Sequence, residues 1–173
     1  MPLTRFPDHE DKRVFVSTVP ALNLPPAAGA YTDRPSIAVL WLDQASPALA
    51  ELNHEFALSL FEHGSLGIVL GGSGAEQAAT IFDEAAAETT HAELEDEAIG
   101  IWADGGATIP ELLFIAAEEA MLPDAFVDQP WDIVVWARSG DAAVPSLKKE
   151  AGRLSALVDE RYELGGEDDV LAD

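Results

Sequence analysis

Short apolar runs alternate with amphipathic segments along most of this chain. Runs that are as long as a strand and apolar throughout are typical of strands buried on both faces. Such runs occur at Ser36–Leu42, Leu66–Leu70, Ala98–Ala103 and Asp132–Ala137, and a β-branched run precedes them at Val14–Val19. The pattern therefore predicts a sheet of about five strands.

Each of the last four predicted strands is followed by a segment whose apolar residues recur at helical spacing. Helix-start signals support these segments, because Ser46 precedes Pro47 and the Ser73/Glu76 and Thr108/Glu111 pairs have capping-box spacing. The expected helices run from Ser46 to Gly64, from Ser73 to about Thr89, from Thr108 to about Leu122, and from about Pro145 to Tyr162.

Four repeats of strand and helix predict βα units joined by right-handed crossovers. We expect a single α/β domain over residues 1–173, with a three-layer, mostly parallel sheet and helices on both faces, of flavodoxin-like or Rossmann-like type. Residues 1–13 are polar and interrupted by proline, so we expect a loose N-terminal arm there. The acidic residues 165–173 are expected to form a frayed C-terminal tail.

The ends of the predicted strands carry the residues with the clearest chemical potential. Ligands of parallel α/β sheets bind at the carboxyl ends of the strands, and these ends meet along one edge. The candidate ligand edge therefore consists of Asp43, Gly72, Ser73, Asp104 and Arg138. The alternative is that these residue types stand there because tight turns and helix caps use them.

The glycine-rich loop from Gly71 to Ala75 permits three interpretations. Before a helix it would cradle a phosphate on backbone N–H groups, although it lacks the Lys-Ser/Thr of a P-loop and Glu76 competes for the helix terminus. It also resembles the nucleophile elbow of α/β-hydrolases with Ser73 as nucleophile, although the only later histidine, His91, precedes two more predicted strands. The simplest interpretation is that Ser73 caps the following helix.

Asp43 and Asp104 both end predicted strands, and two neighbouring carboxylates suit Mg²⁺. The stretch Ile101–Gly106 is similar in outline to the strand-end aspartate of PIN-like nucleases. Apart from Arg138, this edge offers few cations to hold a nucleic acid. The hypothesis that follows is a Mg-dependent enzyme acting on a small phosphorylated or polar substrate.

A formal net charge of −23 on 173 residues points to a different class of function. Such a surface repels nucleic acids and anionic membranes and favours cationic partners. The leading hypothesis is therefore a non-catalytic binding or regulatory protein, of inhibitor, antitoxin or immunity type, whose acidic surface engages a basic protein. The alternative is that the acidity adapts the chain to a saline host.

Candidate contacts for a basic partner are an aromatic residue beside an acidic surface, and the densest acidic run. These are Trp131, and Glu93, Glu95, Asp96 and Glu97. Tryptophan is a frequent interface hot spot, although the other three tryptophans of the chain fall inside strand runs and are expected in the core.

The remaining composition narrows the chemistry. The chain has no cysteine, which excludes disulfides and thiolate metal sites. No apolar run is long enough to span a bilayer and the N-terminus lacks the apolar core of a signal peptide, so we expect a cytoplasmic location. All four histidines, His9 in the loose arm included, are expected to lie on the surface.

Overall fold

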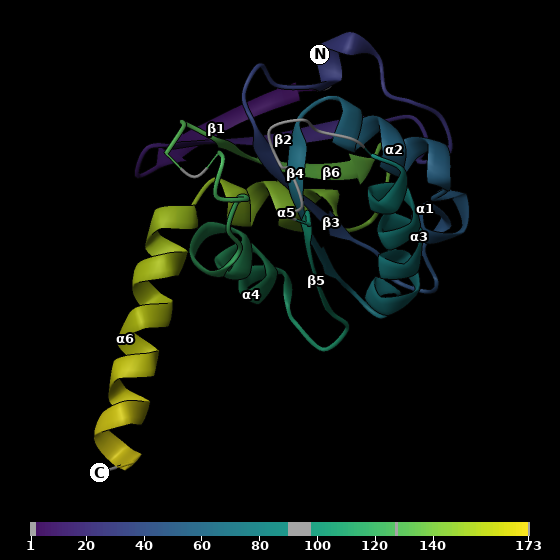
Figure 1. The fold of residues 1–173 in the computed structure, drawn as a ribbon. Coiled ribbons are helices and arrows are strands. Elements are labelled where there is room, and N and C mark those ends of the chain that lie inside the picture. The colour runs from purple at the N-terminus through teal and green to yellow at the C-terminus, as the bar shows by residue number, and fades with distance from the viewer. Residues whose placement is uncertain (1–2, 90–97, 127, 173) are drawn as a thin grey trace.

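A six-stranded sheet lies at the centre of the computed structural model, which describes residues 3–89, 98–126 and 128–172, with side chains as far as residue 164 (Figure 1). The strands are β1 (Leu3–His9), β2 (Lys12–Val19), β3 (Ser36–Trp41), β4 (Ser65–Gly71), β5 (Gly100–Asp104) and β6 (Asp132–Arg138). Their order is β1-β2-β6-β3-β4-β5, and every neighbouring pair is parallel except β1 with β2. The predicted mostly parallel α/β sheet is confirmed.

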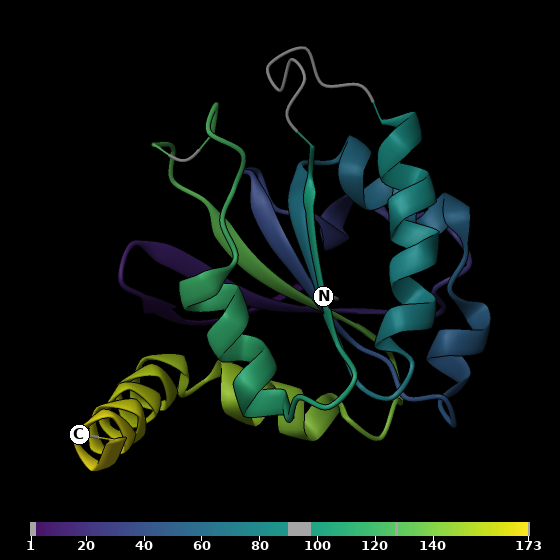
Figure 2. The same ribbon diagram turned by 60° about the horizontal axis from the view of Figure 1, so that its bottom comes forward.

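Helices cover both faces of this sheet, which makes three layers (Figure 2). One face carries α1 (Pro47–Glu51), α2 (His54–Glu62) and α3 (Ala75–Glu88). The other carries α4 (Ile109–Phe114), the π-helical turn Ile115–Glu119, α5 (Val144–Ala151) and the first turns of α6 (Leu154–Ala172). A short 3₁₀ turn, Ala28–Ala30, lies between β2 and β3.

The apolar runs are buried because each central strand contributes side chains to the cores on both faces of the sheet. Along β6, Val134 and Trp136 point into the core beneath α1–α3, whereas Ile133 and Val135 point into the core beneath α4–α6. Successive side chains of a strand alternate between its faces, so a central strand covered on both sides must be apolar throughout. This explains why continuous runs, rather than alternating ones, marked the strands.

The N-terminal arm was predicted wrongly. Residues 1–13 were expected to be loose, but Leu3–His9 form the edge strand β1 and pair with β2, with a register shift between Phe6 and His9. Pro7 fits there because an edge strand does not need every N–H in a ladder. The N-terminal residues therefore add a sixth strand to the expected five.

Three of the predicted helices differ from expectation. The first is interrupted after α1, and Asn53 starts α2 by accepting a hydrogen bond from the backbone N–H of Phe56 at 3.0 Å. The third passes from α4 into the π-helical turn. The last breaks between α5 and α6, and α6 then continues to Ala172, so the expected frayed tail of 165–173 is helical up to that residue.

A buried ion pair joins the amino ends of the central strands. Arg13 of β2 donates from Nε and Nη2 to the two carboxylate oxygens of Asp132, at 2.9 and 2.8 Å, and Asp132 is fully buried at the start of β6. Arg13 also pairs with exposed Asp33, and its hydrogen bond is the main cause that holds the pKa of Asp33 below its ordinary value. Arg34 lies 3.8 Å from the Asp132 carboxylate.

Among the described residues, no helix is long and apolar enough to cross a membrane. The longest helix, α6, carries several acidic residues along its length and projects from the body of the molecule (Figure 1).

The Arg13–Asp132 pair can be tested by Arg13→Gln, which leaves the buried carboxylate with Arg34 as its nearest remaining cation. We expect the free energy of unfolding to fall by about 3–5 kcal/mol, because an uncompensated buried charge keeps its desolvation penalty. Arg5→Gln is the matched control, since Arg5 and Asp8 form an exposed pair worth about 0.5 kcal/mol or less. Urea unfolding followed by circular dichroism measures both, and equal losses would contradict the prediction.

Candidate functional site

The five parallel strands end at one edge of the sheet, and this edge carries the candidate residues. Asp43 follows β3, Gly72 and Ser73 follow β4, Asp104 ends β5 and Arg138 ends β6. In strand order the edge reads Arg138, Asp43, Gly72–Ser73 and Asp104, because β6, β3, β4 and β5 are neighbours. The contacts of each residue decide which of them can act together.

Asp43 and Ser73 are in direct contact. The Asp43 Oδ1 accepts from the backbone N–H of Ser73 at 3.3 Å and lies 3.5 Å from the Ser73 hydroxyl. The Ser73 hydroxyl in turn accepts from the backbone N–H of Gln44 at 2.9 Å, and the Trp41 indole N–H donates to Asp43 Oδ2 at 3.1 Å. These bonds hold the loops after β3 and β4 together, so the Asp43 and Ser73 side chains stabilise this edge of the sheet.

Three backbone N–H groups of the glycine turn are already bonded within the chain. The N–H of Ser73 donates to Asp43, that of Gly74 to the Leu42 carbonyl at 2.8 Å, and that of Ala75 to the Gly72 carbonyl at 3.0 Å. Since an anion site at a helix start depends on such donors, these three bonds weaken the phosphate interpretation, which stays a prediction.

The expected cap of α3 by Ser73 is also wrong. The N-cap is Gly74, which makes no side-chain cap hydrogen bond, and the Ser73 hydroxyl accepts from Gln44 instead. The other two predicted caps form as expected, since Ser46 accepts from Ala48 N and the Thr108/Glu111 capping box is complete.

Asp104 lies apart from Asp43. Strand β4 separates β5 from β3, which puts their backbones about 9–10 Å apart at ordinary strand spacing. The Asp104 Oδ1 accepts from the backbone N–H of Gly106 at 2.9 Å, a local turn contact. A Mg²⁺ site shared by Asp43 and Asp104 stays a prediction.

Arg138 marks the place where the order of the strands reverses. From β3 the chain moves outward to β4 and β5, and then returns to β6 on the other side of β3. Ligands of open α/β sheets bind at such a switch point. The Arg138 Nε donates to both carboxylate oxygens of Glu51, at 3.0 and 2.9 Å, so its charge is paired within the chain.

A cleft of about 290 Å³ opens at this switch point. Asp43, Ser46, Arg138 and Asp141 supply its polar lining. Ser46 donates to Asp141 Oδ2 at 2.7 Å, and Asp141 Oδ1 accepts from Ala143 N at 3.0 Å. Sequence reasoning missed Ser46 and Asp141 as cleft residues, although Asp141 follows its strand much as Asp43 follows β3.

The predicted partner contacts have mixed outcomes. Trp131 is half-buried against the core beneath α4–α6, and the Lys12 ammonium lies 5.1 Å from the centre of its ring. The chain's own cation therefore occupies a position that a cationic partner would seek. The acidic run of Glu93, Glu95, Asp96 and Glu97 lies outside the described residues.

The chain uses most of its positive charge internally. Seven of the nine basic side chains lie within ion-pair distance of a carboxylate: Arg5, Lys12, Arg13, Arg34, Arg138, Arg153 and Arg161. The sequence has no lysine or arginine between Arg34 and Arg138. Helices α1, α2 and α3 therefore contain no basic residue other than histidine.

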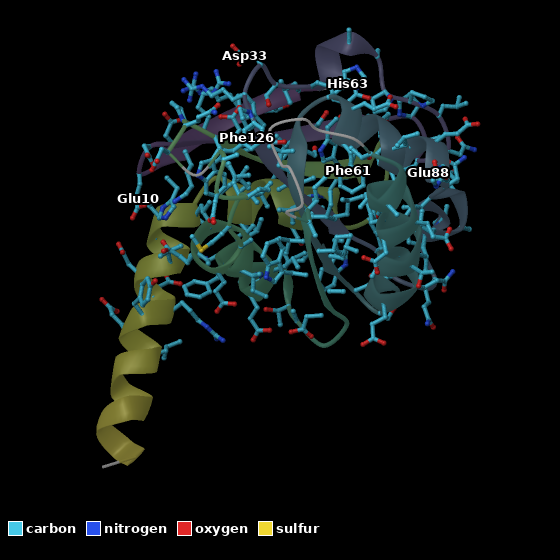
Figure 3. The ribbon with its side chains drawn as sticks, viewed as in Figure 1. Glu10, Asp33, Phe61, His63, Glu88 and Phe126 are labelled. Atoms are coloured by element: carbon cyan, nitrogen blue, oxygen red, sulfur yellow. The ribbon has the colours of Figure 1, made fainter. Side chains whose placement is uncertain are left out.

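Helix α3 consequently has one apolar side and one acidic side. Ala75, Ala78, Phe82 and Ala85 are buried against the sheet and α2. The exposed side carries the four carboxylates that we call the α3 acidic face, Glu76, Asp83, Glu84 and Glu88. Among the described residues, His54 of α2 lies beside this face, with its Nε2 2.7 Å from Glu88 Oε2. Figure 3 labels Glu88.

His9 is the clearest residue that sequence reasoning misplaced. It was expected on the surface, but it is 4% exposed at the end of β1, with Ser155 and Glu118 against its ring. Its partners stand more than a hundred positions away, so local pattern gave no signal of its burial.

Comparison of the chain with protein-family models and with curated proteins finds no match to either. The functional argument therefore depends on the geometry and charge described above.

The loops after β3 and β4 pack closely where Gly72 approaches Leu42. The variant Gly72→Ala tests this contact. Gly72 has a φ of +88°, and a Cβ there would lie 2.5 Å from the Leu42 carbonyl oxygen. We expect a loss of about 2–4 kcal/mol in the free energy of unfolding, from backbone strain and the clash together. Gly140→Ala isolates the strain, because Gly140 has a φ of +83° with nothing within 4 Å of its Cβ position, and should cost about 1 kcal/mol. Thermal and urea unfolding measure both variants. Equal losses in the free energy of unfolding would contradict a contribution from the clash.

Proposed function

We propose that this chain is a cytoplasmic, non-catalytic binding or regulatory protein, of inhibitor, antitoxin or immunity type, and that it engages a basic protein through the α3 acidic face. The observation that supports this proposal is the placement of uncompensated charge. Seven of the nine basic side chains are paired elsewhere, whereas four carboxylates share the exposed side of one helix.

The energetics of α3 favour a binding role over simple solvation. Glu84 and Glu88 are four positions apart, where like charges on a helix repel each other. Asp83, Glu84 and Glu88 lie in its C-terminal half, and the last turn contains no basic residue. Negative charge near a helix C-terminus opposes the macrodipole, at about 0.3–1 kcal/mol for each well-placed charge. A cationic partner would relieve both repulsions on binding.

The acidity also continues along the chain beyond α3. Glu93, Glu95, Asp96 and Glu97 follow the helix in sequence and lie outside the described residues. Exposed charges of one sign accelerate encounter with an oppositely charged partner and make binding weaken as salt rises. Salt dependence is therefore a required property of the proposed complex.

The proposal predicts that charge removal on α3 changes binding and stability in opposite directions. In Asp83→Asn/Glu84→Gln/Glu88→Gln, we expect affinity for a poly-lysine peptide and for lysozyme, as basic probes, to fall about tenfold or more. The free energy of unfolding should rise by about 0.5–1 kcal/mol, because the helix loses its repulsion. Titration calorimetry at two salt concentrations and urea unfolding measure the two effects.

The matched control removes the same charge elsewhere, in Asp128→Asn/Asp159→Asn/Glu163→Gln. These residues are exposed, and Asp159 and Glu163 also form a like-charged pair four positions apart, but within α6 and away from its C-terminal end. The control should lose little affinity. Equal losses in both triple variants would show that net charge alone draws the probe and would overturn the assignment to α3.

A second candidate function is the Mg-dependent enzyme, and the cleft at the switch point favours it. Its polar lining, Asp43, Ser46, Arg138 and Asp141, suits a small phosphorylated or polar substrate better than an apolar one. The paired state of Arg138 with Glu51 weakens this candidate, because a substrate anion would have to compete with that carboxylate.

Metal titration distinguishes this candidate from the binding protein. If Asp43 and Asp104 bind Mg²⁺, Asp43→Asn/Asp104→Asn should abolish saturable Mg²⁺ binding measured by calorimetry, while Asp128→Asn/Asp159→Asn should retain it. Carboxylate-to-amide changes keep the shape and remove the charged oxygen that Mg²⁺ prefers. Equal Mg²⁺ affinity in the two double variants would eliminate the shared site.

A further inference from the structure

A second group of titratable side chains lies far from the strand-end edge, where the β1–β2 hairpin meets the π-helical turn and α6. His9 ends β1 and is 4% exposed. Its Nδ1 is 3.0 Å from the Ser155 hydroxyl, and its Nε2 is 3.0 Å from Glu118 Oε1. Glu10, the next residue of the hairpin, is exposed beside the start of α6 (Figure 3).

These residues bring three potential metal ligands together. One ligand atom each from His9, Glu10 and Glu118 lies within 4.8 Å of the other two. Among the described side chains, those of residues 3–89, 98–126 and 128–164, no other group of three His, Asp or Glu meets that criterion. We propose that His9, Glu10 and Glu118 bind a divalent transition-metal ion of the zinc class.

The donor types favour this class of ion. Imidazole nitrogen suits zinc and its neighbours, whereas Mg²⁺ and Ca²⁺ prefer all-oxygen sites. One histidine and two carboxylates give three protein ligands, and a tetrahedral ion would fill its fourth position with water. Two ligands at about 2.0–2.1 Å from one ion stand about 3.3 Å apart, so the 3.0 Å between Nε2 and Oε1 needs only a small adjustment.

Hydrogen bonds from neighbouring hydroxyl groups orient the side chains of His9 and Glu118. The Ser155 hydroxyl engages Nδ1 of His9, which leaves Nε2 for an ion. The Tyr162 hydroxyl donates to Glu118 Oε2 at 3.3 Å, which leaves Oε1 for the same ion. Metal-binding histidines nearly always use their second nitrogen in this way, and their carboxylate ligands are held likewise.

The backbone around the ligands departs from regular geometry at two places. Glu118 belongs to the π-helical turn, in which Ala120 N–H donates to the Ile115 carbonyl at 2.7 Å, five residues back. Such turns occur frequently at functional sites. Glu10 has a φ of +54°, a left-handed conformation that is uncommon for a residue other than glycine, asparagine or aspartate. Both carboxylates thus belong to irregular backbone, and each has an oxygen within 4.8 Å of a His9 ring nitrogen.

The negative charge of the two carboxylates also favours binding of a cation. Glu10 and Glu118 face His9, and the nearest ion-pair partner of Glu10 is Lys12, whose Nζ is 3.4 Å from Oε2. Lys12 is also engaged with the Trp131 ring. A divalent ion would neutralise both carboxylates and fasten the hairpin to the π-helical turn.

Zinc titration of the full chain, stripped with a chelator, tests the proposal. In about 0.15 M salt, where surface attraction is screened beyond about 8 Å, calorimetry should show one saturable Zn²⁺ per chain. Glu118→Gln and Glu10→Gln should each weaken Zn²⁺ binding by at least about tenfold, and Ser155→Ala by about 10- to 100-fold through loss of the outer contact. Glu10 is 63% exposed, so its variant keeps the test valid if others fail to fold.

His54→Gln is the matched control, because His54 and Glu88 form a second His–Glu pair at 2.7 Å, and no described residue offers a third ligand within reach. This variant should bind Zn²⁺ as the parent chain does. Absence of saturable binding would overturn the proposal, as would binding that survives Glu10→Gln and Glu118→Gln unchanged or that falls equally in His54→Gln. None of these outcomes depends on a basic protein partner.

Discussion

The buried pair of Arg13 and Asp132 fixes the arrangement on which the rest of this molecule depends. Asp132 stands opposite Arg13 on β2 and opposite Ser36 on β3, and its carboxylate is bound by Arg13, so the pair fixes the register of β6 against β2. A slip of one residue would place this charge against apolar neighbours and turn every side chain of β6 to the other core. The far ends of these strands are aligned for the same reason, which brings Arg138 level with the β3 loop.

The parts of the fold that sequence predicted are those whose signal is local. Val134 and its neighbours in β6 form a continuous apolar run because both faces are covered, and the short length and β-branched residues of this run favour a strand. The common edge of Asp43, Ser73, Asp104 and Arg138 followed from the parallel order alone. In contrast, Leu3–His9 reads as a polar arm because a half-exposed edge strand has little apolar periodicity.

The errors share a physical cause, which is competition from partners distant in sequence. Ser73 has the spacing of a capping box, but the N–H of Gln44, about thirty residues earlier, takes its hydroxyl. His9 looked like a surface residue, but Glu118 and Ser155 enclose it. The cleft residues Ser46 and Asp141 come from opposite sides of the switch point, so only the folded sheet brings them together. The local sequence pattern does not predict these hydrogen bonds, because their partners come together only when the chain has folded.

The glycine turn after β4 has a consequence for motion. Three consecutive amide protons there, those of Ser73, Gly74 and Ala75, are bonded to acceptors of the same chain. Amides that are engaged in this way exchange with solvent only when their surroundings open. A segment rich in glycine would ordinarily be taken for a pliable loop, yet here it belongs to the rigid framework. The carboxylate of Asp43, which lines the cleft, is therefore held by an amide of this framework.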